Sequence, residues 1–137
     1  MAKTFQAPCL QNVNNLICKL DDSMSSLQLA WTAGVDDGVL KSFWATSTNS
    51  SDLLLRVTRN IGGSGTDDII ATVSIPANSG DDGASEAVSI MDYLPCSLDA
   101  NGNYVLWCLA GTTIKVVTTA AIGSGHFVYC QGDGFDF

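Results

Sequence analysis

The chain has 137 residues, of which 46% are hydrophobic and 15% charged, and its formal net charge is −8. This length is typical of one domain that buries a core without disulfide or metal staples. The acidic balance disfavours nonspecific nucleic-acid binding, which needs a basic surface, and docking on an anionic membrane. The centres of permanent protein–protein interfaces are depleted in charged residues. The low content of charged residues therefore also favours an oligomer or attachment to a larger body.

Residues 1–26 show no clear hydrophobic period and are predicted to form an N-terminal arm or a first strand. They contain no apolar stretch of the kind found in a signal peptide. No run in the chain approaches the roughly 18 apolar residues of a membrane helix. The five cysteines are odd in number and include no CxxC pair. These features favour assembly in a reducing cytoplasm with free thiols.

From residue 27 onward the chain consists of short strand-sized runs separated by turns rich in Gly, Ser and Asp. The runs cover residues 27–31, 39–46, 52–59, 69–75, 87–91, 104–109, 112–121 and 126–131. Val and Ile stand beside Thr throughout, as on a pleated and half-buried surface. About eight short strands without a helical period predict an all-β fold, an antiparallel and jelly-roll-like β-sandwich over residues 27–134.

Alternation within these runs predicts which side chains lie inside. In the run 52–59, alternate residues from Leu53 to Val57 share one face, and in the run 69–75 alternate residues from Ile69 to Ile75 do so. Trp31, Trp44 and Trp107 each lie in or at the end of a strand run. We expect them to pack in the core, although exposed tryptophans could stack on sugars.

The segment from Asp99 to Asn103 carries oxygen ligands at alternate positions, as the start of a calcium loop does. It lacks the glycine expected at the sixth position and the glutamate at the twelfth, where Tyr104 and Ala110 stand. A hairpin turn with Asn-Gly at its apex explains the same residues without a metal. We therefore expect a turn.

Paired aspartates are the second candidate for ion binding. The pairs are Asp21-Asp22, Asp36-Asp37, Asp67-Asp68 and Asp81-Asp82. Loops from several subunits could bring such pairs together around a divalent ion, but nothing in the sequence selects which loops would meet. A solvated acidic rim that keeps the protein soluble is the preferred interpretation.

The nucleophiles and bases of the chain do not form a catalytic pattern. His126 is the only histidine, no Gly-x-Ser-x-Gly elbow is present, and Ser124 lies too close in sequence to serve as its nucleophile. The cysteines do not have zinc spacing, and nothing nearby would lower their pKa. We predict no catalytic residue, no metal ligand and no cofactor, and we expect the chain not to be an enzyme.

The C-terminal residues 135–137 form a short aromatic tail after the predicted sandwich. Phe135 and Phe137 stand among Gly and Asp residues, which makes packing into their own sandwich difficult. Such aromatics are either frayed or serve as anchors that fill pockets on a partner. We favour the anchor interpretation.

The running order of residues 50–134 resembles that of small phage proteins encoded beside the capsid gene. The matching features in chain order are an Arg-bearing strand at 53–57, a strand ending at 73–77, a Ser/Gly/Asp loop, a hydrophobic segment ending at 94–95, the segment 98–103, a strand closing at 109–111, the segment 113–116, a Thr/Ala-rich turn and a last strand ending at 131–133. Such proteins are often jelly-roll decoration, or cement, proteins that form trimers on the outer surface of icosahedral heads. Residues 1–49 and 135–137 fall outside the resemblance.

The resemblance implies a virion structural protein that binds the major capsid protein as a homo-oligomer, a trimer, and stabilises the head by bridging capsomers. The expected location is the capsid surface after assembly in the host cytoplasm. The residues expected to dock on the partner are Phe5, Pro8, Leu16, Phe135 and Phe137. A tail, neck or fibre component and a carbohydrate-binding β-sandwich module are the alternatives.

Overall fold

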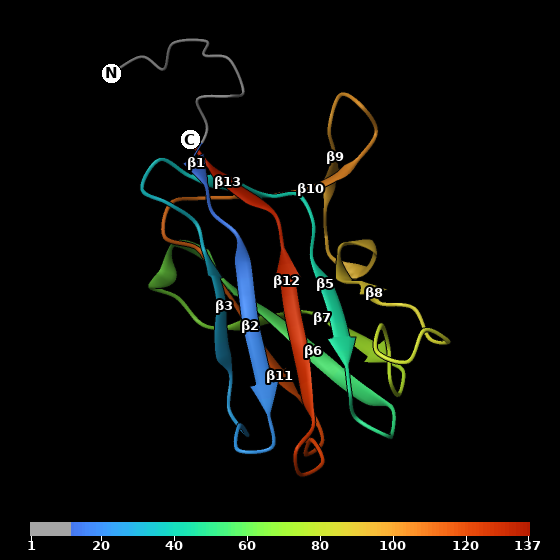
Figure 1. The fold of residues 1–137 in the computed structure, drawn as a ribbon. Helices are drawn as coiled ribbons and strands as arrows, with labels where there is room; N and C mark the ends of the chain where they lie inside the picture. Colours follow the sequence, from blue (N-terminus) through green and yellow to red (C-terminus); the bar gives the residue numbers. More distant parts are fainter. Residues whose placement is uncertain (1–11) are drawn as a thin grey trace.

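The computed structural model describes residues 12–137, and within this range the chain is all-β with no α-helix (Figure 1). The strands are β1 (Asn12–Val13), β2 (Leu16–Asp21), β3 (Gln28–Thr32), β4 (Gly38–Leu40), β5 (Trp44–Ser47), β6 (Leu53–Asn60), β7 (Asp68–Ile75), β8 (Val88–Ser89), β9 (Ser97–Leu98), β10 (Tyr104–Cys108), β11 (Thr113–Thr118), β12 (Phe127–Gly132) and β13 (Gly134–Asp136). Two single 3₁₀ turns, η2 (Ile61–Gly63) and η3 (Ile90–Tyr93), interrupt them. The prediction of an antiparallel all-β protein is confirmed.

The strands form three antiparallel sheets. Two have four strands, in the orders β2-β12-β5-β8 and β3-β11-β6-β7, and the third has five, in the order β1-β13-β4-β10-β9. Figure 1 shows β2, β12 and β5 in front of β6, β7 and β11. The thirteen strands exceed the predicted eight because several are pairs of residues beside a bend, too short to give a pattern of their own.

Two of the sheets are successive segments of the same three strands. The order β1-β13-β4 in one repeats as β2-β12-β5 in the other, so each of these strands crosses from one sheet to the other at a shared corner. At this corner the main-chain carbonyl of Asp133 accepts from the N–H groups of Lys41 at 2.8 Å and Ser42 at 3.2 Å. The N–H of Asp133 in turn donates to the Ser42 hydroxyl at 2.8 Å. The predicted run 39–46 is therefore two strands separated by this bend.

Glycines flank Asp133 because the neighbouring strands come too close for a side chain. A Cβ on Gly132 would overlap the carbonyl oxygen of Ser42, and a Cβ on Gly134 would overlap the carbonyl oxygen of Asn14. The N–H of Asn14 donates to the Gly134 carbonyl at 2.8 Å, which ties the third strand to the corner. The Gly-Asp-Gly sequence is thus a requirement of the bend.

The main core lies between the two four-stranded sheets and follows the predicted alternation. Leu55 and Val57 of β6, Ile114 of β11 and Val128 of β12 are all fully buried in it. The prediction for Ile69 is wrong, since this side chain is 57% exposed. A bulge shifts the pairing of β6 with β7 between Val57 and Thr58, so the inward set of β7 does not extend to its first residues.

The described parts of both terminal segments contribute strands to sheets, which for residues 1–26 is compatible with the expected first strand. Residues 16–21 form β2 within a sheet, and residues 134–136 form β13 between β1 and β4. Of the expected docking residues, Phe5 and Pro8 lie outside the described residues. Leu16 is fully buried in the main core and leaves no side-chain surface for a partner.

The close approach at the corner predicts that Gly132→Ala lowers the free energy of unfolding by about 1–3 kcal/mol, because the strand must move away from Ser42. Chemical denaturation of the full chain measures this change. Gly65→Ala is the matched control, since a Cβ there meets only the Asn60 amide oxygen at 3.6 Å. We expect the control to change stability by less than about 0.5 kcal/mol. Equal effects of the two substitutions would contradict the close approach.

Candidate functional site

The segment from Asp99 to Asn103 is the turn of the β9–β10 hairpin, as predicted. The Asp99 carboxylate accepts the N–H groups of Asn101 and Asn103, both at 2.9 Å, and its main-chain carbonyl accepts that of Gly102 at 3.0 Å. Gly102 has φ of 78°, as the apex of such a turn requires. One carboxylate oxygen is thus occupied by backbone donors that hold the turn.

The acidic pairs also serve local structure. The Asp82 carboxylate accepts the N–H groups of Ala84 and Ser85, and that of Asp21 accepts the N–H and hydroxyl of Ser23. These hydrogen bonds favour the ionised forms and lower the pKa of both carboxyls below its ordinary value. Within residues 12–137, no three His, Cys, Asp or Glu side chains form a group that could hold a metal ion.

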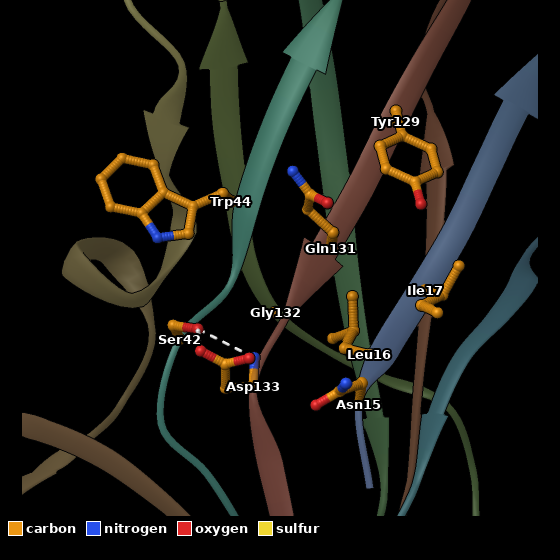
Figure 2. Close-up of a pocket in the computed structure, with 9 residues that line it drawn as sticks. All are labelled: Asn15, Leu16, Ile17, Ser42, Trp44, Tyr129, Gln131, Gly132 and Asp133. Carbon is orange, nitrogen blue, oxygen red and sulfur yellow. Dashed lines mark hydrogen bonds between the residues drawn. The ribbon is translucent and has the colours of Figure 1, made fainter.

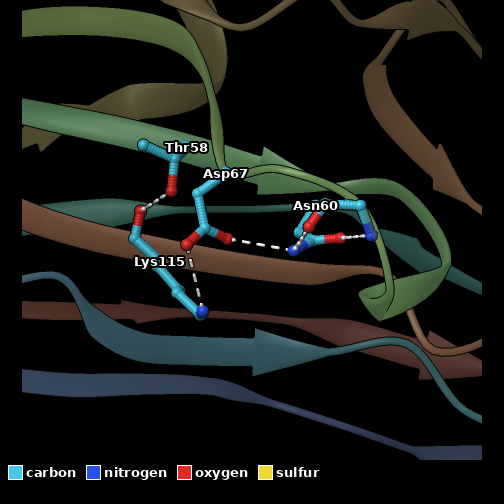
Figure 3. A network of polar contacts seen from close by, with 5 residues as sticks. Thr58, Asn60, Asp67 and Lys115 are labelled. Atoms are coloured by element: carbon cyan, nitrogen blue, oxygen red, sulfur yellow. Dashed lines mark hydrogen bonds and ion pairs between the residues drawn. The ribbon is translucent and has the colours of Figure 1, made fainter.

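Asp67 belongs to a polar network at the end of β6 (Figure 3). Its carboxylate receives the Lys115 ammonium at 3.2 Å and the Asn60 amide at 3.2 Å. The Asn60 amide also bonds the main chain of Gly65 in both directions at 2.9 Å. The network fixes the loop between β6 and β7, and its ion pair is too exposed to stabilise the protein by more than a small amount.

His126 makes a structural contact at the start of β12. Its Nδ1 lies 3.3 Å from the Thr48 hydroxyl, which also accepts the N–H of Phe127 at 3.0 Å. Ser124 is exposed in the preceding turn. Within the described part of the chain, no hydrogen bond joins these two residues to each other or to a carboxylate, so they do not form a catalytic arrangement there.

Three of the described cysteines, Cys18, Cys108 and Cys130, are buried, and burial makes their thiols unreactive. Cys18 and Cys130 are directly opposed on β2 and β12 and face the main core. Burial is the main cause that raises the pKa of both thiols, and it raises the pKa of the Cys108 thiol from 9.0 to about 11. Such thiols stay protonated and unreactive near neutral pH.

This burial predicts the order of alkylation in the folded protein. At mildly alkaline pH we expect iodoacetamide to modify the half-buried Cys96 well before Cys108 and Cys130, whose thiolate fractions are reduced about a hundredfold or more. The rate at Cys108 should still rise with pH above 9.0, because its pKa is raised. Peptide mass spectrometry reads each site, and protein unfolded in urea is the control. Equal native rates at Cys96 and Cys130 would contradict the assignment.

Two of the three tryptophans lie outside the core, contrary to the prediction. Trp31 is 2% exposed and donates from Nε1 to the Asn14 carbonyl at 2.8 Å, whereas Trp44 is 44% and Trp107 56% exposed. The strand period explains the difference, because Trp44 stands between buried Phe43 and Ala45. Strict alternation would have found the exposed ring of Trp44, whose face neighbours Ser42 and Thr46 are polar, but not that of Trp107, whose run is apolar on both faces.

The C-terminal phenylalanines pack on the outer face of the five-stranded sheet, opposite the main core. We call this the terminal face; it consists of Val13, Val39, Val105, Trp107, Phe135 and Phe137. The Phe137 and Trp107 rings are stacked at 5.4 Å between centroids and 8° between planes. The Lys41 ammonium lies 5.0 Å from the Phe135 ring centroid. Phe135 and Phe137 are half-buried, so they are neither frayed nor free extensions.

The terminal face combines a small buried base with exposed apolar rings. Val39 and Val105 are 1% and 2% exposed but lie outside the main core cluster. Above them Val13 is 68% and Trp107 56% exposed. Contiguous exposed apolar side chains of this kind mark interaction surfaces on soluble proteins. The terminal face is therefore the best candidate for contact with a partner protein.

Comparison with known protein families, with curated proteins and with solved structures gives no significant match to the chain. In residues 12–137 no helix has both the length and the apolar character needed to cross a membrane.

Proposed function

We propose that the chain is a virion structural protein, a capsid decoration (cement) protein that binds the outer surface of a phage head as a trimer. The observation that carries the proposal is the terminal face, where exposed Trp107 stacks on half-buried Phe137 and exposed Val13 lies on the same face, with two strands between its own strand and that of Trp107. A central aromatic anchor surrounded by other apolar contacts is typical of binding hot spots. The partner is the major capsid protein, and the trimer bridges neighbouring capsomers.

The strand order supports a jelly-roll assignment for the sandwich. In the eight strands of the two four-stranded sheets, the first pairs with the last, β2 with β12, and the second with the seventh, β3 with β11. The third pairs with the sixth, β5 with β8, and the fourth with the fifth, β6 with β7. This nested pairing is that of a jelly roll, a fold found in viral capsid and lectin domains. Because the fold serves several functions, it supports the proposal without selecting it.

The mechanism proposed is mechanical. Several copies of the terminal face in one trimer would engage neighbouring capsomers at once, so attachment gains avidity from modest single contacts. Expansion or rupture of the head would then have to break these contacts. No catalytic step enters the proposal, because Asp99, His126 and the buried thiols take part in local structure.

The proposal predicts that Trp107→Ala weakens binding to heads about tenfold or more, the loss expected for an aromatic hot spot. The full chain and its variant are mixed with heads from phage that lack the protein, and occupancy is measured by sedimentation. Trp44→Ala is the matched control, since it removes an equally exposed indole from a different sheet. Thermal unfolding verifies that both variants fold.

Four other outcomes of these binding experiments would each contradict one part of the proposal. Unchanged occupancy of the Trp107→Ala variant would remove the docking role of the terminal face, and no binding of the wild-type chain to heads would overturn the function itself. Copies confined to one vertex or the tail in electron micrographs would favour the tail, neck or fibre alternative. A monomer in sedimentation equilibrium and on the head would contradict the trimer.

A further inference from the structure

A second exposed aromatic residue, Trp44, lies on the outer face of the sheet β2-β12-β5-β8. Its partner across β12 is Gln131, which pairs on its other side with Ile17 of β2. Figure 2 shows these three side chains, with Tyr129 of β12, on the same side of the sheet. The row is therefore a platform of alternating apolar and polar side chains that the main core does not use.

The platform borders an open hollow of about 330 Å³ beside Trp44. Its polar lining comes from Asn15, Ser42, Gln131 and Asp133, together with the Tyr129 side chain. Ser42 and Asp133 are fixed by the corner hydrogen bonds. Among the described residues, the side chains of Asn15, Gln131 and Tyr129 make no hydrogen bond, so their donors and acceptors are available to a ligand.

A second hollow of about 410 Å³ lies on the other side of Trp44 and shares Ser42 and Trp44 with the first. Its lining includes Asp92, Asn101 and the 50% exposed Tyr104. We call the two hollows together the Trp44 cleft. Because Trp44 lines both hollows, a chain-like ligand that extends from one to the other would pass the indole.

The lining chemistry selects the class of ligand. Exposed aromatic rings offer flat faces with negative charge density, which attract the polarised C–H groups of a sugar ring. Amide, carboxylate and hydroxyl groups around them match the hydroxyls of the same ring as donors and acceptors. The carboxylates of Asp92, Asp99 and Asp133 outnumber Lys41, the one cation in the lining, which disfavours acidic sugars and phosphates.

We propose that the Trp44 cleft binds a neutral oligosaccharide, with one sugar ring stacked on the indole of Trp44 and its hydroxyls bonded to Gln131 and Asp133. The side chains that carry this proposal, those of Trp44, Gln131 and Asp133, are not part of the terminal face. The second hollow also takes Tyr104 and Val105 from the five-stranded sheet, and Val105 is the one side chain that it shares with the terminal face. A decoration protein with such a cleft would hold the particle on glycans of a cell surface or mucus. If the chain is instead a carbohydrate-binding β-sandwich module that does not bind heads, the same cleft would be its binding site.

The test uses the full chain on an array of neutral and acidic glycans, followed by calorimetric titration with the neutral oligosaccharide that gives the strongest signal. We expect binding of neutral glycans, and a loss of affinity of about tenfold in Trp44→Ala, the free energy of one aromatic contact. Trp44→Phe should retain part of the affinity because it keeps a ring. Gln131→Ala should weaken binding while leaving the platform in place.

Trp107→Ala is the matched control for this experiment and should bind the glycan as the wild type does. The proposal would be overturned if no neutral glycan on the array bound, or if only acidic glycans bound. Equal affinity of the wild type and Trp44→Ala for the glycan would overturn it as well. If the wild-type chain bound no glycan but self-associated, and Trp44→Ala abolished this self-association, the cleft would be a contact with a second copy of the chain. That result would also overturn the proposal. Head binding is measured separately, so failure here leaves the proposed function in place.

Discussion

The close packing of three bent strands at the corner around Asp133 is the constraint on which the rest of the structure depends. Gly132 and Gly134 let the main chain pass within contact of Ser42 and Asn14, where any side chain would overlap a carbonyl oxygen. Before the bend, β12 brings Val128 and Cys130 into the main core. After it, β13 carries Phe135 to the opposite face of the next sheet. One corner therefore joins the sandwich core to the terminal face.

The same corner shapes the Trp44 cleft. Ser42, Gly132 and Asp133, which hold the bend together, also line the first hollow. Asp133 uses its main chain to fix the corner, and among residues 12–137 its carboxylate accepts one hydrogen bond, from the Ser42 hydroxyl at 3.3 Å. A functional group held by a rigid main chain is already positioned for a ligand, which reduces the ordering cost of binding. The two candidate surfaces thus depend on one structural element while using different side chains.

Much of the fold could be predicted from the sequence, because a strand period of two is visible in single runs. The inward residues Leu55, Val57 and Ile114 follow from alternation alone. The Asp99–Asn103 turn follows from its Asn-Gly apex. The bend within 39–46 could not be predicted, since it depends on contacts with residues about ninety positions away in sequence, such as Ser42 with Asp133. The tail was misjudged for the same reason: Phe137 finds its packing partner, Trp107, on a distant strand.

The bulge between β6 and β7, where Ile70 of β7 is the extra residue, shows a further limit of sequence patterns. The pattern of 69–75 suggested one inward face, but the register shift between Val57 and Thr58 leaves Ile69 exposed. A bulge is a property of two paired strands, and one strand alone gives no sign of it. The exposed Trp44 differs in this respect. The outward position of Trp44 follows from its own neighbours, so only the general preference of large rings for the core argued against it. The run around Trp107 is apolar on both faces and gives no such sign.

The acidic composition has a physical origin that is separate from any partner. Asp21, Asp82 and Asp99 each accept main-chain N–H groups of turns, a role that needs a short side chain with a carboxylate or amide. A fold with so many tight connections needs many such residues, and aspartate supplies them at the cost of net negative charge. The aromatic side chains of the terminal face and of the Trp44 cleft stand mainly on strands instead. Part of the net charge of −8 therefore has its origin in how the turns are built, and the two proposed binding surfaces rest on exposed aromatic side chains instead of on this charge.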